Sequence, residues 1–286
     1  MLRKIGHLIV MLALTTVLAH AQTAANKPNE GDMYCSGVIT TQAPPHDTYV
    51  ISGVESDQRI IFGMGNLVFV NKGAKQGVKV GDQFEVSRPE YDHQMQAPWI
   101  TWQESITKAM GTTYADLGRL RVASVQENTS TAEVVQSCDY IQRGDIVQPF
   151  TPRPAPQYKA AVKFDPFAPA SGKPMAMIVS TLRFGVAAGA GRIVYVNWGA
   201  KQGVQVGNYF RVFRYQDNHH DKVYEIPKSD YMTFGFGAAP KPYGWSDLPR
   251  DVLGEGIVLR VGPNASTVLL TNSLREIYIG DYVELE

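Results

Sequence analysis

Residues 68–88 read VFVNKGAKQGVKVGDQFEVSR, and residues 194–214 read VYVNWGAKQGVQVGNYFRVFR. The two stretches align without a gap, and 14 of their 21 positions are identical. Agreement this dense over one window indicates a duplicated unit. The sequence therefore predicts two copies of one domain.

The likeness between the copies continues beyond this stretch. Residues 117–125 align with residues 253–261, and each copy ends in a Gly-Asp pair that leads into a strand, at 144–147 and at 280–283. Several short strands separated by turns at this spacing are typical of small barrels and sandwiches. We therefore predict an all-β fold of two tandem small β-barrel-like repeats.

Glycine and aspartate are expected at the turns of each repeat. Glycine has no Cβ and adopts positive φ readily, and an aspartate next to it caps the local backbone. Asn208 replaces Asp82 in the second copy, which suits a turn and would not suit an acid or base. The valines at 78, 80, 204 and 206 are expected to turn the chain back into the core. The predicted structural turn residues are Gly73, Gly77, Gly81, Asp82, Gly144, Asp145, Gly199, Gly203, Gly207, Gly280 and Asp281.

Both copies leave the strand pattern after the repeated stretch, over residues 89–116 and 215–250. In the first excursion, apolar residues recur at spacing four from Trp102 to Met110, and Thr101 with Glu104 has the spacing of a capping box. This pattern predicts one short helix, Trp102–Met110, lying on the barrel. The alternative is an aromatic-rich loop without regular structure.

The chain begins with Arg3 and Lys4, a short apolar run, and the small-x-small sequence Ala19-His20-Ala21. This order predicts a signal peptide over residues 1–21, the alternative being an uncleaved membrane anchor. We expect a flexible N-terminal segment at 22–47, the first repeat at 48–150, a proline-rich linker at 151–175 and the second repeat at 176–286. No later segment is apolar enough for a membrane span, so we expect an exported protein of the bacterial periplasm or outer envelope.

The charge balance and the cysteine content bear on nucleic-acid binding and on disulfide formation. The chain has 27 basic and 27 acidic residues, which lacks the basic excess typical of nucleic-acid binding. Its two cysteines are Cys35 and Cys138. A lone pair of cysteines in an exported protein predicts a disulfide, the alternative being two separate buried thiols.

The sequence contains no recognisable arrangement of catalytic or metal-binding residues. There is no G-x-S-x-G motif, and no pair of histidines has the spacing of a metal site. The cluster at 217–221, DNHHD, has metal-ligand residue types, but adjacent ligands rarely face one ion, so a solvated loop is the preferred interpretation. We therefore predict no catalytic residues, no metal and no cofactor.

The aromatic residues of the excursions are the better candidates for binding. They could stack on sugars or form a protein interface. The alternative is that they cover open barrel edges and small local cores. The predicted binding surface consists of Trp99, Trp102, Tyr231, Phe234, Tyr243 and Trp245.

The pattern V-x-V-N-x-G-x-x-x-G-V-x-V-G, followed by L-G-x-x-x-V-x-x-V and I-x-x-G-D-x-V, resembles small β-domains of exported bacterial envelope proteins. It resembles the C-terminal β-domain of flagellar assembly protein T, and it is similar to β-domains found with LysM modules. The likeness covers residues 68–147 and 194–283. It implies a non-catalytic module in an envelope assembly.

These observations together predict a non-catalytic exported structural or binding component of the bacterial envelope. Its partner would be an envelope protein or a glycan. One alternative is a peptidoglycan- or carbohydrate-binding protein that uses the aromatic loops. A second alternative is an exported hydrolase with an unrecognised site.

Overall fold

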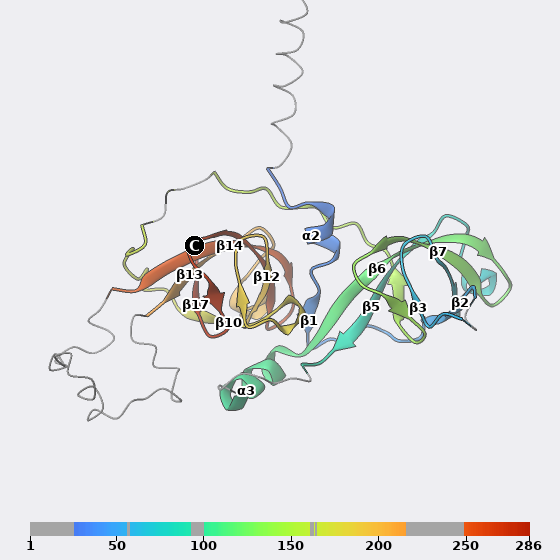
Figure 1. Cartoon of the computed structure of the whole chain (residues 1–286), viewed down its shortest axis with the longest axis horizontal. Coiled ribbons are helices and arrows are strands. Elements are labelled where there is room, and N and C mark those ends of the chain that lie inside the picture. Colours follow the sequence, from blue (N-terminus) through green and yellow to red (C-terminus); the bar gives the residue numbers. More distant parts are fainter. Residues whose placement is uncertain (1–25, 56–57, 93–99, 161–162, 164, 216–248) are drawn as a thin grey trace, which may run out of the picture.

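The computed structural model describes residues 26–286 except 56–57, 93–99, 161–162, 164 and 216–248. The described chain is almost entirely β-structure, with two α-helices, α2 (Glu30–Tyr34) and α3 (Ile100–Met110). It forms two β-domains side by side. The first repeat is on the right of Figure 1 and the second is on the left. The prediction of an all-β fold with barrel-like repeats is confirmed.

The second repeat is a closed six-stranded barrel in the order β10-β12-β15-β14-β13-β17. A two-stranded sheet of β11 (Ala187–Ala188) and β16 (Ile277–Tyr278) lies beside it. The barrel strands are β10 (Met175–Thr181), β12 (Ile193–Val196), β13 (Tyr209–Arg214), β14 (Asp251–Val261), β15 (Ser266–Ser273) and β17 (Tyr282–Leu285).

The first repeat has the same strand order, β2-β4-β7-β6-β5-β9. Its two edge strands are joined by an isolated bridge between Tyr49 and Ile146. A two-stranded sheet of β3 (Ile61–Phe62) and β8 (Ile141–Gln142) lies beside it, as in the second repeat. The main strands are β2 (Val50–Gly53), β4 (Leu67–Val70), β5 (Gln83–Glu90), β6 (Thr112–Val125), β7 (Ser130–Ser137) and β9 (Ile146–Pro149).

Alternating side chains of these strands fill a separate core in each repeat. Phe84 and Val86 of β5 are buried, as are the aligned residues of β13. The expectation that Val80 and Val206 turn into the core is wrong, because they are 68% and 51% exposed. Val80 lies in the turn closed by the hydrogen bond from the Asp82 amide to the Lys79 carbonyl, outside the alternation of the strands.

Each G-A-K-Q-G sequence forms a 3₁₀ turn, η1 (Ala74–Gln76) and η3 (Ala200–Gln202). The two glycines of the motif have different structural roles. Gly77 has φ 82°, so it supplies the left-handed residue that ends the turn. Gly73 has ordinary extended φ, but a Cβ there would lie 2.5 Å from the amide nitrogen of Thr129. The first glycine therefore lets the turn approach the hairpin between β6 and β7.

The N-terminal segment, expected to be flexible over 22–47, is folded in its described part. It contains helix α2 and strand β1 (Val38–Thr40), which pairs with the start of β6. Asn29 and Asp32 form a capping box at the start of α2. Met33 and Ile39 are each 2% exposed, so burial of these two apolar side chains orders a segment whose composition is polar overall.

Helix α3 spans Ile100–Met110, so it begins two residues before the predicted start at Trp102. The helix also packs in a different place from the one expected. Gln103 Nε2 donates a hydrogen bond to the Val179 carbonyl in β10, at 2.9 Å, and Met110 is buried among residues of the second repeat. The helix of the first excursion therefore reaches across to the second barrel (Figure 1).

The two glycines of the first turn should respond differently to alanine. Gly77→Ala places a Cβ at positive φ in open space and should lower the free energy of unfolding by about 1–2 kcal/mol. Gly73→Ala forces a Cβ against the hairpin and should cost about 3 kcal/mol. Urea denaturation followed by circular dichroism measures both, and equal losses would contradict the two roles.

Candidate functional site

A third cluster of buried apolar residues lies between the two repeats. Met33, Ile39 and Met110 come from the first part of the chain and pack on the outer face of the second barrel. Strand β12 is therefore buried on both faces, with Ile193 and Tyr195 turned outward into this cluster. The cluster contains Met33, Ile39, Met110, Val179, Ile193, Tyr195, Tyr209, Ile257, Leu259, Ala265 and Leu269.

Polar contacts fix the same junction. The Asp116 carboxylate of β6 accepts hydrogen bonds from the Gly37 amide at 2.8 Å and from Arg260 Nη1 at 2.8 and 3.0 Å. Thr267 Oγ1 of the second barrel donates to the Gly37 carbonyl at 3.0 Å. The Tyr195 hydroxyl donates to the Ser36 carbonyl at 2.9 Å, and burial raises its pKa, so it stays protonated. Residues 36 and 37 are thus bound by both repeats at once.

Cys35 and Cys138 form a disulfide, as predicted, with their Cα atoms 5.3 Å apart. The bond ties the end of α2 to the chain just after β7 and closes a loop with a sequence separation of 103. In the chain-entropy account, a loop of this length stabilises the folded state by about 4–5 kcal/mol. The disulfide therefore anchors to the first repeat the same segment that packs on the second.

A comparison of the two copies shows how the sequence encodes the junction. Ile193 pairs with Leu269 on the outer face of the second barrel, and the equivalent pair in the first repeat is Leu67 and Glu133. Glu133 forms an exposed ion pair with Arg121 at 3.0 Å. The outer positions are thus apolar in one copy and partly charged in the other. This difference was the signal that could have located the junction.

An arginine–aspartate pair recurs at the same place in both repeats. Arg88 contacts Asp145 through two hydrogen bonds of 2.7 and 2.8 Å, and Arg214 contacts Asp281 through two of 2.6 and 2.7 Å. Burial raises the pKa of Asp281, and the Arg214 guanidinium opposes that rise. These aspartates therefore do more than cap their Gly-Asp turns, because each buried carboxylate also pairs with an arginine of β5 or β13.

At the other Gly-Asp turn, the described residues form no such pair. Asp82 Oδ2 accepts from the Lys79 amide at 2.8 Å, and Asn208 Oδ1 accepts from the Gln205 amide at 2.7 Å. The amide of asparagine supplies the same acceptor as the carboxylate. This equivalence explains why the second copy tolerates asparagine here.

The glycines of the remaining turns also differ in their backbone conformation. Gly81, Gly144, Gly203, Gly207 and Gly280 all have positive φ, between 81° and 98°. Gly199 matches Gly73, with extended φ and a close approach to the hairpin at Ala265. The chain conformation at these positions therefore requires residues without a side chain.

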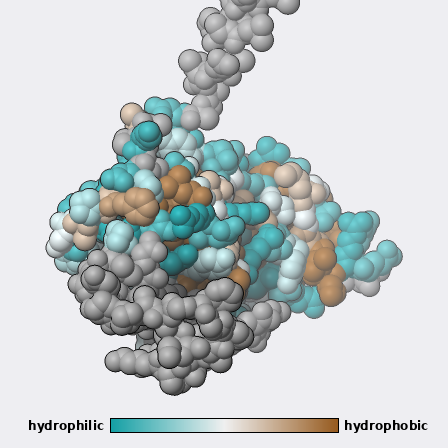
Figure 2. All heavy atoms as spheres, turned by 60° about the vertical axis from the view of Figure 1, so that its left-hand side comes forward, coloured by the Kyte–Doolittle hydropathy of each residue, from teal (hydrophilic) through white to brown (hydrophobic). Residues whose placement is uncertain are grey.

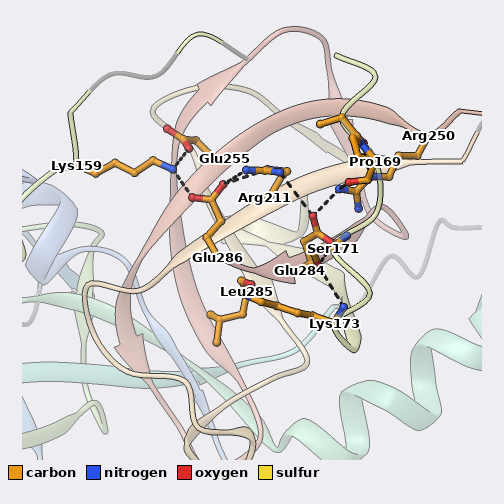
Figure 3. A network of polar contacts seen from close by, with 11 residues as sticks. Lys159, Pro169, Ser171, Lys173, Arg211, Arg250, Glu255, Glu284, Leu285 and Glu286 are labelled. Atoms are coloured by element: carbon orange, nitrogen blue, oxygen red, sulfur yellow. Dashed lines mark hydrogen bonds and ion pairs between the residues drawn. The ribbon is translucent and has the colours of Figure 1, made fainter. Parts of the chain in front are cut away.

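The proline-rich linker is held against the outside of the second barrel by charged contacts (Figure 3). Lys159 forms ion pairs with Glu255 and Glu286. Farther along the linker, Ser171 Oγ donates to Glu284 at 2.7 Å, beside the ion pair of 2.6 Å between Glu284 and Arg250. Burial raises the pKa of Glu284, but the hydrogen bonds from Arg250 and Ser171 outweigh it and lower the pKa to about 2.

A groove of about 450 Å³ opens beside the junction, next to helix α3. Its apolar lining includes Ile39, Val179 and Phe184, and its polar lining includes Glu90 and Glu104. The volume is within the range of small-ligand sites. Its carboxylates come from the first repeat and its helix α3, whereas Val179 and Phe184 come from the second repeat.

The exposed apolar side chains are otherwise scattered. The largest exposed fractions belong to Ile60 at 81%, Val80 at 68% and Met64 at 65%. On the face drawn in Figure 2, hydrophobic patches alternate with hydrophilic ones. Single exposed apolar residues of this kind are normal for a folded protein.

Most of the predicted binding surface lies outside the described residues. This applies to Trp99, Tyr231, Phe234, Tyr243 and Trp245, and to the DNHHD cluster at 217–221. Trp102 is placed only as part of the backbone of α3. The aromatic binding surface therefore stays a prediction.

Two general properties can be stated for the described part of the chain. It contains no group of three or more His, Cys, Asp or Glu side chains arranged to hold a metal ion. In those same residues, no helix is long and apolar enough to cross a membrane.

The fold and its junction define a protein built from two small β-barrels that share a buried interface. Residues 65–149, which run from just before β4 to the end of β9, match the family described as flagellar assembly protein T, C-terminal domain. This match confirms the predicted resemblance for the first repeat. Among curated proteins, none matches the chain.

The two Gly-Asp turns of the first repeat offer a matched pair of substitutions. Asp82→Asn should change the free energy of unfolding by less than about 0.5 kcal/mol, because the second copy already carries asparagine there. Asp145→Asn leaves Arg88 without its counterion and should cost about 2–3 kcal/mol. Urea denaturation at pH 7 measures both values. A loss for Asp82→Asn as large as that for Asp145→Asn would contradict the assignment.

The Glu284 carboxylate should make stability depend on acid pH. Its pKa is about 2 in the folded protein and rises to the ordinary value of 4.5 on unfolding. Its contribution is therefore complete above about pH 4.5 and disappears as the pH falls toward 2, a loss of about 3 kcal/mol. In urea denaturation at a series of pH values, Glu284→Gln should be less stable than the parent at pH 7, and the two should converge in acid.

The control for this experiment is Glu133→Gln, which removes an exposed carboxylate. Its stability should follow that of the parent protein across the same pH range. A deficit in Glu284→Gln that stays constant from pH 7 to pH 2 would show that the carboxylate does not titrate as described.

Proposed function

We propose that this protein is a non-catalytic, exported structural component of the bacterial envelope, whose two joined barrels dock an envelope protein. The observation that carries the proposal is the match of residues 65–149 to a domain of a flagellar assembly protein. The disulfide between Cys35 and Cys138 supports export, because such bonds persist in oxidising compartments.

The way the repeats are joined supports a scaffolding role. An apolar cluster, the ion pair between Asp116 and Arg260, and the disulfide-anchored segment all connect the two barrels. A protein that spaces other components needs its own surfaces held at a fixed separation. The junction provides that separation through buried contacts.

Fractionation and crosslinking in the source bacterium test this function. The untagged protein, detected by antibody, should be found in the periplasmic or envelope fraction and should crosslink into a complex of higher mass. Arg260→Ala, which removes the ion pair to Asp116 across the junction, should reduce the crosslinked complex. Arg121→Ala, which removes an exposed ion pair to Glu133 on the first barrel, is the matched control and should not.

Two outcomes would contradict the proposal. Recovery in the cytoplasmic fraction would exclude export. Sedimentation of the purified protein with purified sacculi, without a crosslinked protein complex, would favour the glycan-binding alternative.

A further inference from the structure

The groove beside α3 contains a carboxylate that has no partner. Glu90 is the last residue of β5 and is partly buried. Within the described residues, its side chain has no hydrogen bond and no ion pair. A partly desolvated carboxylate left in this state costs free energy, which a cation in the groove would recover.

The charges around Glu90 explain why it stays unsatisfied. Burial raises its pKa, the nearby Asp139 carboxylate raises it further, and Arg88 and Arg183 lower it. Both arginines are engaged elsewhere: Arg88 pairs with Asp145 at 2.7 Å, and Arg183 lies 3.5 Å from Asp139. The described structure therefore shows neither arginine in contact with Glu90, although the exposed pair of Arg183 with Asp139 is weak.

The second carboxylate of the groove is also weakly paired. Glu104 of α3 lies 3.8 Å from Lys108, and both side chains are more than half exposed. Such an exposed pair contributes little and can exchange partners. The groove thus presents Glu90 and Glu104 to an incoming ligand, with Asp92 and Lys108 also in its lining.

The apolar side of the groove is held in a strained conformation. Arg183 and Phe184 have φ values of 63° and 56°, and consecutive left-handed residues other than glycine are rare. Strain of this kind persists where the surrounding structure enforces it, and it gathers at ligand-binding positions. Here it accompanies the placement of Phe184 at the wall of the groove that also contains Ile39 and Val179.

We propose that this groove binds a cationic peptide segment of the envelope partner, with an arginine at Glu90 and an adjacent apolar side chain against Tyr91 and Phe184. The inference rests on the proposed function and names the chemistry of its docking site. Arginine fits better than lysine, because its planar guanidinium can bond a carboxylate and stack on an aromatic ring such as Phe184.

Binding of short peptides to the purified full chain tests the proposal. The probes are acetyl-Leu-Arg-Leu-Gly-amide, its charge-reversed form with glutamate in place of arginine, and argininamide alone. In amide NMR spectra, the arginine peptide should shift the signals of Thr107 and Gly111, which line the groove. The glutamate peptide should not shift them, and argininamide should bind at least about tenfold more weakly because it lacks the apolar side chains.

Two variants sharpen the test. Glu90→Gln should weaken binding of the arginine peptide by at least about tenfold, because it removes a charge-assisted contact. Glu127→Gln, which removes an exposed carboxylate paired with Lys75 in the β6–β7 turn, should not. Phe184→Gly removes the strain, so it should weaken binding without lowering stability against urea.

Three results would overturn the proposal: equal shifts by the two charged peptides, unchanged affinity in Glu90→Gln, or argininamide binding as strongly as the peptide. The last result would assign the groove to a small cationic molecule. These outcomes are independent of the envelope crosslinking. A crosslinked complex without peptide binding overturns the groove alone, whereas peptide binding by a protein confined to the cytoplasm overturns the export function alone.

Discussion

The structure depends on the burial of one short piece of backbone at Gly37. Its amide donates to Asp116 of the first repeat, and its carbonyl accepts from Thr267 of the second. Its φ is 64°, and a Cβ would lie 2.6 Å from the Tyr195 hydroxyl oxygen. Because only glycine fits there, the two barrels can close on this segment and satisfy its polar groups from both sides. Burial of the apolar side chains of Met33 and Ile39 then stabilises this contact.

Strand β6 makes this arrangement possible. From Gly118 onward it belongs to the first barrel, where it pairs with β7. At its start, over residues 112–114, it pairs with β1 instead, and β5 remains its other neighbour there. A Cβ at Gly118 would collide with the Gln136 carbonyl, so the close approach of the chains at this crossing requires glycine. One strand thus connects the core of a barrel to the core of the junction.

The repeat architecture was predictable, because duplicated glycine turns and alternating strands are local signals. The disulfide followed from the cysteine count and the expected compartment. The order of the N-terminal segment was not predictable in the same way, since Met33 and Ile39 are isolated apolar residues in a polar stretch. The cluster that they join is built mainly from residues 179–269, far away in the sequence. The outward apolar residues Ile193 and Leu269 carried the missing information, but only when compared with Leu67 and Glu133. The Arg88–Asp145 pair was missed because a turn role already explained the aspartate.

The disulfide-anchored segment also has a consequence for the order of folding. Residues 33–39 leave the ribosome early, but the surface that covers Ile39 is built from strands that begin at Ile193 and end with Ser273. The first repeat can close and join Cys35 to Cys138 before that surface exists. During this interval the apolar side chains of the segment are exposed, as in other chains dominated by distant contacts. A segment that comes early in the chain is therefore covered only once the second barrel has formed.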